Sequence, residues 1–190
     1  MARAEVDPCA ALHEALLSPE GMSTARSALL QVHSWFLHAS RVDAFEAIKG
    51  SGLEPRNPGC AAPELVRQRL GEGADAIVCL RPMGTLDTTP NRGDHQFLMA
   101  IAGDCLPSRI GLDWSFDGCW NLACIVKHDL PVKSDDEVFC DVIRRRGSVV
   151  SYEPIPSGAL RVWAKGTPED NPAQWPKLED TNQNDAEVLS

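Results

Sequence analysis

The sequence predicts an α+β fold in which helices come first. Apolar residues recur at three- and four-residue spacing within residues 1–34, which is typical of amphipathic helices. From residue 35 onward, short β-type runs follow one another at intervals of about 8 to 15 residues, with turn residues between them. Helices followed by a series of strands favour an α+β fold over alternating βαβ units.

The predicted helices and the first strand are marked by local signals. Within residues 1–34, Ser18 in "SPEG" is a cap between two helices, and "SWFLHAS" is a short buried strand. Ser40 or Asp43 caps the helix that follows, and Gly52 ends it as a left-handed glycine. A loop, "EPRNPGCAAP", then leads to a short helix that begins with proline, "PELVRQRLG".

The remaining β-type runs complete the predicted fold. They are "DAIVCLRPM", "HQFLMAIAG", "NLACIVKH", "EVFCDVI", "GSVVSYEPI" and "ALRVWAKG". After Gly166 the chain is rich in proline, acids and amides, which favours disorder. We therefore expect an N-terminal helical segment (1–34) packed on the core, a catalytic-like α+β domain (35–165) and an acidic, disordered tail (166–190).

Charge and hydropathy narrow the class of protein. The net charge is −9 and the sequence pI is about 5.0, which argues against tight binding to duplex nucleic acid. No apolar run approaches the roughly 20 residues that span a bilayer, and the first residues do not form a secretory signal. The sequence thus predicts a cytoplasmic protein with no membrane partner.

The seven cysteines are predicted to be reduced thiols. Their number is odd, they are spread along the chain, and several lie in apolar runs. The alternative is a zinc site built from Cys119, Cys124 and His128, but no CxxC pair is present and the spacing matches no common ligand pattern. We therefore predict no metal.

The end of the first strand is the strongest candidate site. His38 ends an apolar strand, and Ser40, two residues later, points to the same side. An imidazole and a hydroxyl side by side can hold a ribose diol, and the start of the next helix offers N–H groups to a phosphate or an amide. A structural histidine at a strand end is the alternative interpretation.

The segment "FLHAS…AFEAIKGSGLEP" resembles the first motif of the ADP-ribosyltransferase superfamily, in which a strand ends in His-x-Thr/Ser and a helix closes with "I…GL". The resemblance implies a split β-sheet core and NAD as the substrate, with His38 on a ribose hydroxyl and Ser40 near the nicotinamide. The chain looks most like the DarT-like branch, which modifies bases of single-stranded DNA. Shorter similar segments are "PELVRQRLGEGADAIVCLRPMG", "HQFLMAIAG" and "IRRRGSVVSYEPIPSGALRVW".

The branch places a catalytic glutamate near the start of its last strand, a position that falls near Ser148 or Val149 here. Glu153, a few residues later, is our candidate, because a carboxylate beneath the ribose stabilises the oxocarbenium-like transition state. The alternative is that the glutamate is absent. Arg69 matches the branch's functional arginine, and Arg81 is a candidate for the pyrophosphate.

The acceptor is expected to be single-stranded DNA or a protein. Arg144 and Arg145, in the only basic cluster, are candidates for a nucleic-acid phosphate, and Trp114 can stack on a base or fill the core. The sequence thus predicts an NAD-dependent ADP-ribosyltransferase acting on a nucleobase or a protein side chain. The alternatives are a non-catalytic nucleotide-binding or protein-interaction module on the same fold, and an interaction protein without a nucleotide.

Overall fold

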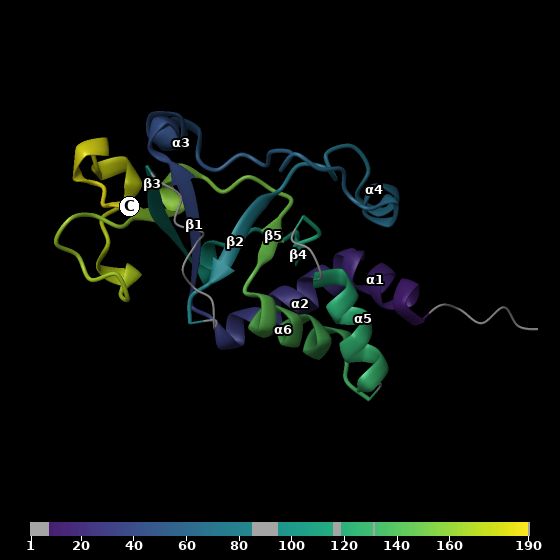
Figure 1. Cartoon of the computed structure of the whole chain (residues 1–190). Helices are drawn as coiled ribbons and strands as arrows, with labels where there is room; N and C mark the ends of the chain where they lie inside the picture. Colours follow the sequence, from purple (N-terminus) through teal and green to yellow (C-terminus); the bar gives the residue numbers. More distant parts are fainter. Residues whose placement is uncertain (1–7, 85–94, 116–118, 131, 190) are drawn as a thin grey trace, which may run out of the picture.

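The computed structural model describes residues 8–84, 95–115, 119–130 and 132–189. It is a mixed α/β structure around an antiparallel sheet of strand order β4-β5-β2-β1-β3-β6, with β7 also paired to β3 (Figure 1). The strands are β1 (Trp35–Arg41), β2 (Val78–Pro82), β3 (Gln96–Ala102), β4 (Ile110–Leu112), β5 (Val149–Ser151), β6 (Leu160–Val162) and β7 (Val188–Leu189). The prediction of a fold that contains both helices and strands is confirmed at this level, although helices interrupt the predicted series of strands.

Four helices lie together on one side of the sheet, and two shorter ones lie nearer its other end (Figure 1). The first group is α1 (Pro8–Leu17), α2 (Pro19–Val32), α5 (Cys119–Asp129) and α6 (Asp135–Arg146). The second is α3 (Phe45–Ser51) and α4 (Glu64–Leu70). The large group gives the sheet one thick helical layer.

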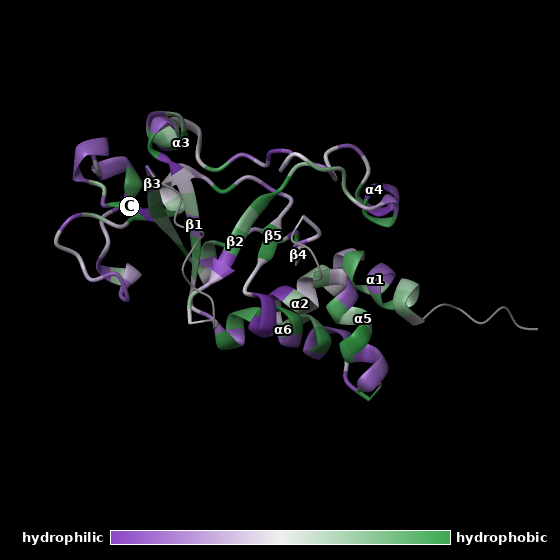
Figure 2. Cartoon of the chain, in the orientation of Figure 1, coloured by the Kyte–Doolittle hydropathy of each residue, from purple (hydrophilic) through white to green (hydrophobic). Residues whose placement is uncertain are grey.

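Alternating side chains on the central strands pack against different layers. On β1, Phe36 belongs to the main core with the helices, whereas Leu37 belongs to a second cluster that contains Trp175. Residues i and i+2 of a strand share one face, so His38 and Ser40 lie on the same face as Phe36. Figure 2 shows the hydrophobic character of β2 and β5 in the middle of the sheet. Both faces of the central strands are therefore covered.

The predicted disordered tail is instead packed on the sheet. Trp175 and Leu178 are fully buried, and β7 extends the ladder of β3 at the pair Phe97↔Val188. The acidic residues that suggested disorder lie on the outer turns of this segment, which Figure 2 shows as largely hydrophilic. Because Leu37 and its neighbours would otherwise face water, burying them compensates for the entropy of ordering the segment.

Two predicted strands are helices. "NLACIVKH" lies in α5, and "EVFCDVI" lies in α6. In α6 the buried apolar residues recur with helical period, the Ser134 N–H donates to Glu137 Oε2 at 2.8 Å, and Gly147 ends the helix in the left-handed region (φ 68°). The signals at the two ends of α6 therefore outweigh the β-type composition of its interior, and the segment is a helix.

The predicted helix boundaries are partly confirmed. Ser18 caps α2, its Oγ accepting from the Gly21 N–H at 2.9 Å. Gly52 ends α3 with φ 84°, but its ψ of −164° is not that of the predicted left-handed helical conformation. The predicted cap by Ser40 or Asp43 is wrong, since no side chain caps α3 and the Asp43 carboxylate instead pairs with Arg41 at 2.7 Å. A single 3₁₀ turn, Val42–Ala44, makes the transition from strand to helix.

Candidate functional site

The site begins where β1 and β2 separate. The two strands pair at Phe36↔Pro82 and Leu37↔Arg81, and no further pair joins them in the described sheet. On its other side, β1 stays paired with β3 as far as Arg41↔Gln96. The second half of β1 therefore has one open edge, and His38 is the first residue of that half.

His38 bridges the opening with one of its ring nitrogens. Its Nδ1 lies 2.8 Å from the Cys79 carbonyl oxygen, so Nδ1 carries the proton and donates. Burial lowers the pKa of His38, and the hydrogen bond to Cys79 opposes this only in part. The ring is therefore neutral, and Nε2 is a hydrogen-bond acceptor to which no described residue donates.

A pocket of about 110 Å³ lies at this opening. It contains both residues that the sequence analysis assigned to the ribose, His38 and Ser40, and the described residues include no hydrogen-bond partner for the Ser40 hydroxyl. The rest of the lining comes from the end of α3, the loop after it and the start of β2: Ile48, Gly52, Leu53, Glu54, Arg56, Ile77 and Val78. The volume is below the roughly 300 to 1,000 Å³ of ligand pockets, so it suits one ring of a larger ligand.

Two charged residues that the sequence did not predict as site residues also line the pocket. Glu54 and Arg56 are both exposed and line the same pocket as His38. The Arg56 backbone is held by its bridge to Ile77, with N···O distances of 3.1 and 3.0 Å in the two directions. Glu54 directly follows the "SGL" of the motif and Arg56 lies two residues later, so their proximity to the motif was the available signal. Residues that carry an acceptor nitrogen, a hydroxyl, a carboxylate and a guanidinium thus line one pocket.

We expect the free energy of unfolding to fall as the pH drops below the ordinary histidine pKa of 6.5. The unfolded chain then binds a proton on residue 38 before the folded chain does, so stability declines until the lowered folded pKa is also passed. His38→Asn keeps a donor for the Cys79 carbonyl but cannot titrate, so its stability should depend less on pH between about 6.5 and 5. Urea unfolding at several pH values checks this, and equal slopes for both proteins would contradict it.

Glu153 does not line this pocket. Its Oε2 accepts from the Ser108 hydroxyl at 3.0 Å and from the Arg109 N–H at 2.9 Å. Partial burial raises the pKa of Glu153, but these hydrogen bonds outweigh it, so the net shift is downward. The carboxylate is therefore held ionised in a loop contact between the turn before β4 and the end of β5.

The other two sequence-selected arginines also lie outside the pocket lining. Arg69 is exposed on α4 and pairs with Glu14 of α1 at 2.6 Å. Arg81 is half-buried on β2, opposite Leu37 of β1. Of the candidate cofactor contacts, the structure brings only His38 and Ser40 together, and it adds Arg56 as the guanidinium at the opening.

The candidate acceptor residues are not at the opening either. Arg144 and Arg145 are exposed at the end of α6, where Arg144 pairs with the buried Asp141 at 2.7 Å. The strand that follows pairs Val149 with Leu80, at the end of the β2–β5 ladder away from Val78. Trp114 is 9 % exposed and packs in a core cluster with Val66, Ile77 and Tyr152, which leaves no face for stacking on a base.

The structure joins Cys9 and Cys124 in a disulfide, so the prediction of reduced thiols is wrong for this pair. They lie 115 residues apart in sequence and meet because α1 packs on α5. The alternative zinc ligands are not gathered, since Cys119 is buried whereas His128 is exposed beside Asp129. Within the described ranges, the group with metal-ligating potential is Cys9, His13 and Cys124.

Among the described helices, none has the length and apolar character needed to cross a bilayer. No family model, no curated protein and no solved structure matches this chain. The geometry of the site therefore carries the functional argument.

Proposed function

We propose that this chain is an ADP-ribosyltransferase that binds NAD at the pocket between β1 and β2. The observation that carries the proposal is that His38, Ser40, Glu54 and Arg56 line one pocket, and that the Nδ1 hydrogen bond of His38 leaves Nε2 as its acceptor. Two further features support the proposal. The strands β1 and β2 separate at this pocket, and "FLHAS…GSGLEP" resembles the first motif of the superfamily. NAD carries ribose hydroxyls, which an imidazole and a hydroxyl can bind, and phosphates, which a guanidinium can bind.

In this proposal each residue has a role that follows from its chemistry. His38 accepts a hydrogen bond from a ribose hydroxyl through Nε2, because Nδ1 is committed to Cys79. Ser40 holds the nicotinamide side, and the exposed Arg56 meets the pyrophosphate outside the small pocket. The adenosine half lies on the surface, since the pocket has room for only one ring.

We assign the transition-state carboxylate to Glu54 rather than Glu153, because Glu54 lines the pocket that contains His38 whereas Glu153 does not. The C1′–N bond breaks with nicotinamide taking the electron pair, and positive charge develops on the ribose. Glu54 stabilises that charge and takes the proton of the acceptor as its nucleophile bonds to C1′. Glu153 instead keeps its two donors, Ser108 and Arg109, in the loop.

Two matched variants test the assignment. We expect Glu54→Gln to lower NAD consumption by roughly 100-fold while NAD still binds, as for loss of one transition-state group. Glu153→Gln should leave consumption within about threefold, because its carboxylate lies outside the pocket. Release of nicotinamide, measured by chromatography, and calorimetric NAD binding are the readouts. The opposite ranking of the two variants would return the catalytic role to Glu153.

The acceptor is tested in the same assay with labelled NAD and separate pools of single-stranded DNA, RNA and protein. Label in the DNA or the protein pool identifies a nucleobase or a side chain as the acceptor. Binding without consumption in any pool favours the second candidate, a non-catalytic nucleotide-binding module. The small volume of the pocket and the absence of Glu153 from its described lining also favour this candidate. No binding of NAD at millimolar concentration, in a thermal-shift assay, would overturn both.

A further inference from the structure

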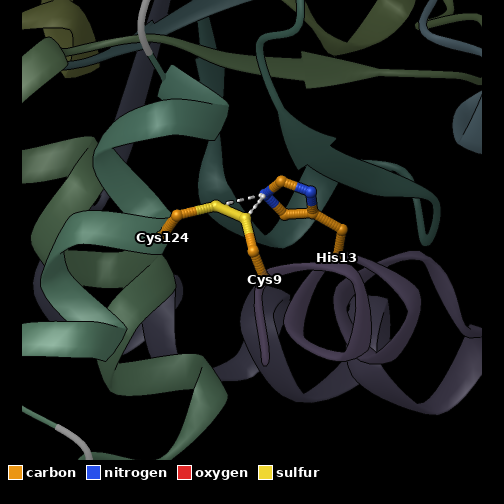
Figure 3. Close-up of side chains that lie close together, drawn as sticks. All are labelled: Cys9, His13 and Cys124. Carbon is orange, nitrogen blue, oxygen red and sulfur yellow. Dashed lines mark hydrogen bonds between the residues drawn. A yellow bond between two sulfur atoms is a disulfide. The ribbon is translucent and has the colours of Figure 1, made fainter. Parts of the chain in front are cut away.

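A second cluster of chemically active side chains lies far in sequence from the nucleotide pocket. Cys9 and His13 are one helical turn apart on α1, so they share a face, and that face meets Cys124 of α5. Figure 3 shows the imidazole aimed at the two sulfurs, with His13 Nε2 3.4 Å from Cys124 Sγ and 3.9 Å from Cys9 Sγ. All three side chains are half-buried.

The two nitrogen–sulfur spacings are close to the edges of a tetrahedral zinc site, whereas the sulfur–sulfur edge forms only when the disulfide opens. With Zn–S near 2.3 Å and Zn–N near 2.05 Å, neighbouring sulfur and nitrogen ligands lie about 3.5 Å apart. The observed distances of 3.4 and 3.9 Å bracket this value. Two thiolates and an imidazole are also the donor types that zinc prefers over harder oxygen ligands.

The two sulfurs must separate for an ion to enter. In the disulfide form they are bonded, whereas two thiolates on one zinc ion lie about 3.8 Å apart. The Cα atoms of Cys9 and Cys124 are 5.2 Å apart, so rotation about the Cα–Cβ bonds can supply this separation with the helices in place. The Trp120 carbonyl oxygen, 3.2 Å from His13 Nε2, is near ligand–ligand spacing, and it or a water can complete the shell.

We propose that the reduced chain binds one Zn²⁺ ion through Cys9, His13 and Cys124, and that the disulfide is the oxidised, metal-free form of the same site. A thiol reductant supplies two electrons and two protons that convert the disulfide to two thiols, and is itself oxidised to a disulfide. Both thiols then lose their protons to solvent as zinc binds, and the His13 proton moves to Nδ1 so that Nε2 can ligate.

Either cross-link ties the start of α1 to α5. A disulfide limits the unfolded chain, and a structural zinc ion adds its binding free energy to folding. In a reducing environment thiols persist and the metal form is expected, whereas under oxidising conditions the disulfide takes its place. The site is built from α1 and α5 and uses none of the pocket residues, so it does not depend on the proposed transferase function.

The test is metal binding by the reduced, chelator-treated full chain under an inert atmosphere. We expect one equivalent of Zn²⁺ by mass spectrometry, with a Kd below about 1 μM. Co²⁺ should give the intense visible bands of a tetrahedral site and a thiolate charge-transfer band. Cys9→Ser, Cys124→Ser and His13→Gln should each weaken zinc binding at least tenfold, and the cysteine variants should lose charge-transfer intensity.

Matched controls keep the result interpretable. Cys105→Ser and His128→Gln change an exposed free thiol and an exposed imidazole outside the cluster, and should leave zinc affinity unchanged. Circular dichroism of each variant shows whether it folds, and the Co²⁺ spectrum of the unmutated chain gives an answer even if a variant does not. A reduced, folded chain that takes up no zinc, or that binds it equally well without His13 and Cys124, would overturn the proposal.

Discussion

Replacing Gly52 with alanine is expected to destabilise the fold by more than about 3 kcal/mol and to abolish ligand binding at the pocket. Gly52 has φ 84° and ψ −164°, a backbone region that is almost restricted to glycine. A Cβ atom here would lie 2.2 Å from the Ile155 carbonyl oxygen. That oxygen accepts from the Leu53 N–H at 2.8 Å, so the clash would break the bridge that holds the pocket wall.

Gly50 is the matched control for this substitution. It lies within α3, is exposed, and an added Cβ would meet no atom within 4 Å. Gly50→Ala should therefore stabilise the helix by about 0.5 to 1 kcal/mol. Urea unfolding measures both variants. Equal effects of the two substitutions would show that the close approach of Gly52 to Ile155 does not exist in solution.

Trp175→Ala should cost about 3 to 5 kcal/mol of unfolding free energy, the usual range for a large aromatic side chain in a core. Trp175 is 0 % exposed, packs on Leu37 and Leu98, and stacks with Trp163 at a centroid distance of 6.4 Å. Its Nε1–H also donates to the Pro168 carbonyl oxygen at 2.8 Å. Truncation would leave a cavity against one face of β1 and β3 and expose their apolar side chains.

The neighbouring Gln174→Ala provides the comparison, because that side chain is exposed and should matter by less than about 0.5 kcal/mol. Trp175→Phe keeps most of the ring and removes the Nε1 donor, so its cost should fall between the two. Thermal unfolding and urea titration provide the measurements. If Trp175→Ala left stability unchanged, the C-terminal segment would be the disordered tail that its composition suggests.

Local signals were enough for most of the fold. The strands β1, β2, β3, β5 and β6 and the helices α1 to α4 fall within segments that composition and periodicity assigned to them. Ser18 and Gly52 act at helix ends because capping and glycine conformation depend on a few adjacent residues. The same kind of signal was present for α6, in Ser134, Glu137 and Gly147, but the β-branched interior dominated the interpretation.

The candidate site was also predictable only in part. The placement of His38 and Ser40 on one side of a strand follows from the two-residue repeat and was predicted. The identity of the nearby carboxylate was not, because it depends on where the loop after α3 lies against β2. Glu54 and Glu153 are both acids next to proline in sequence, and only the three-dimensional structure shows that Glu54 lines the same pocket as His38.

By itself, the sequence determined the mixed α/β class, the presence of the first strand and the placement of an imidazole and a hydroxyl on one face of it. These properties depend on residues within a few positions of one another. Tertiary structure alone decided that β1 and β2 separate, that Trp175 covers the second face of the sheet, and that Cys9, His13 and Cys124 meet. Such contacts join residues that are far apart in the chain, and their partners are chosen by the burial of whole apolar faces, which no local pattern records.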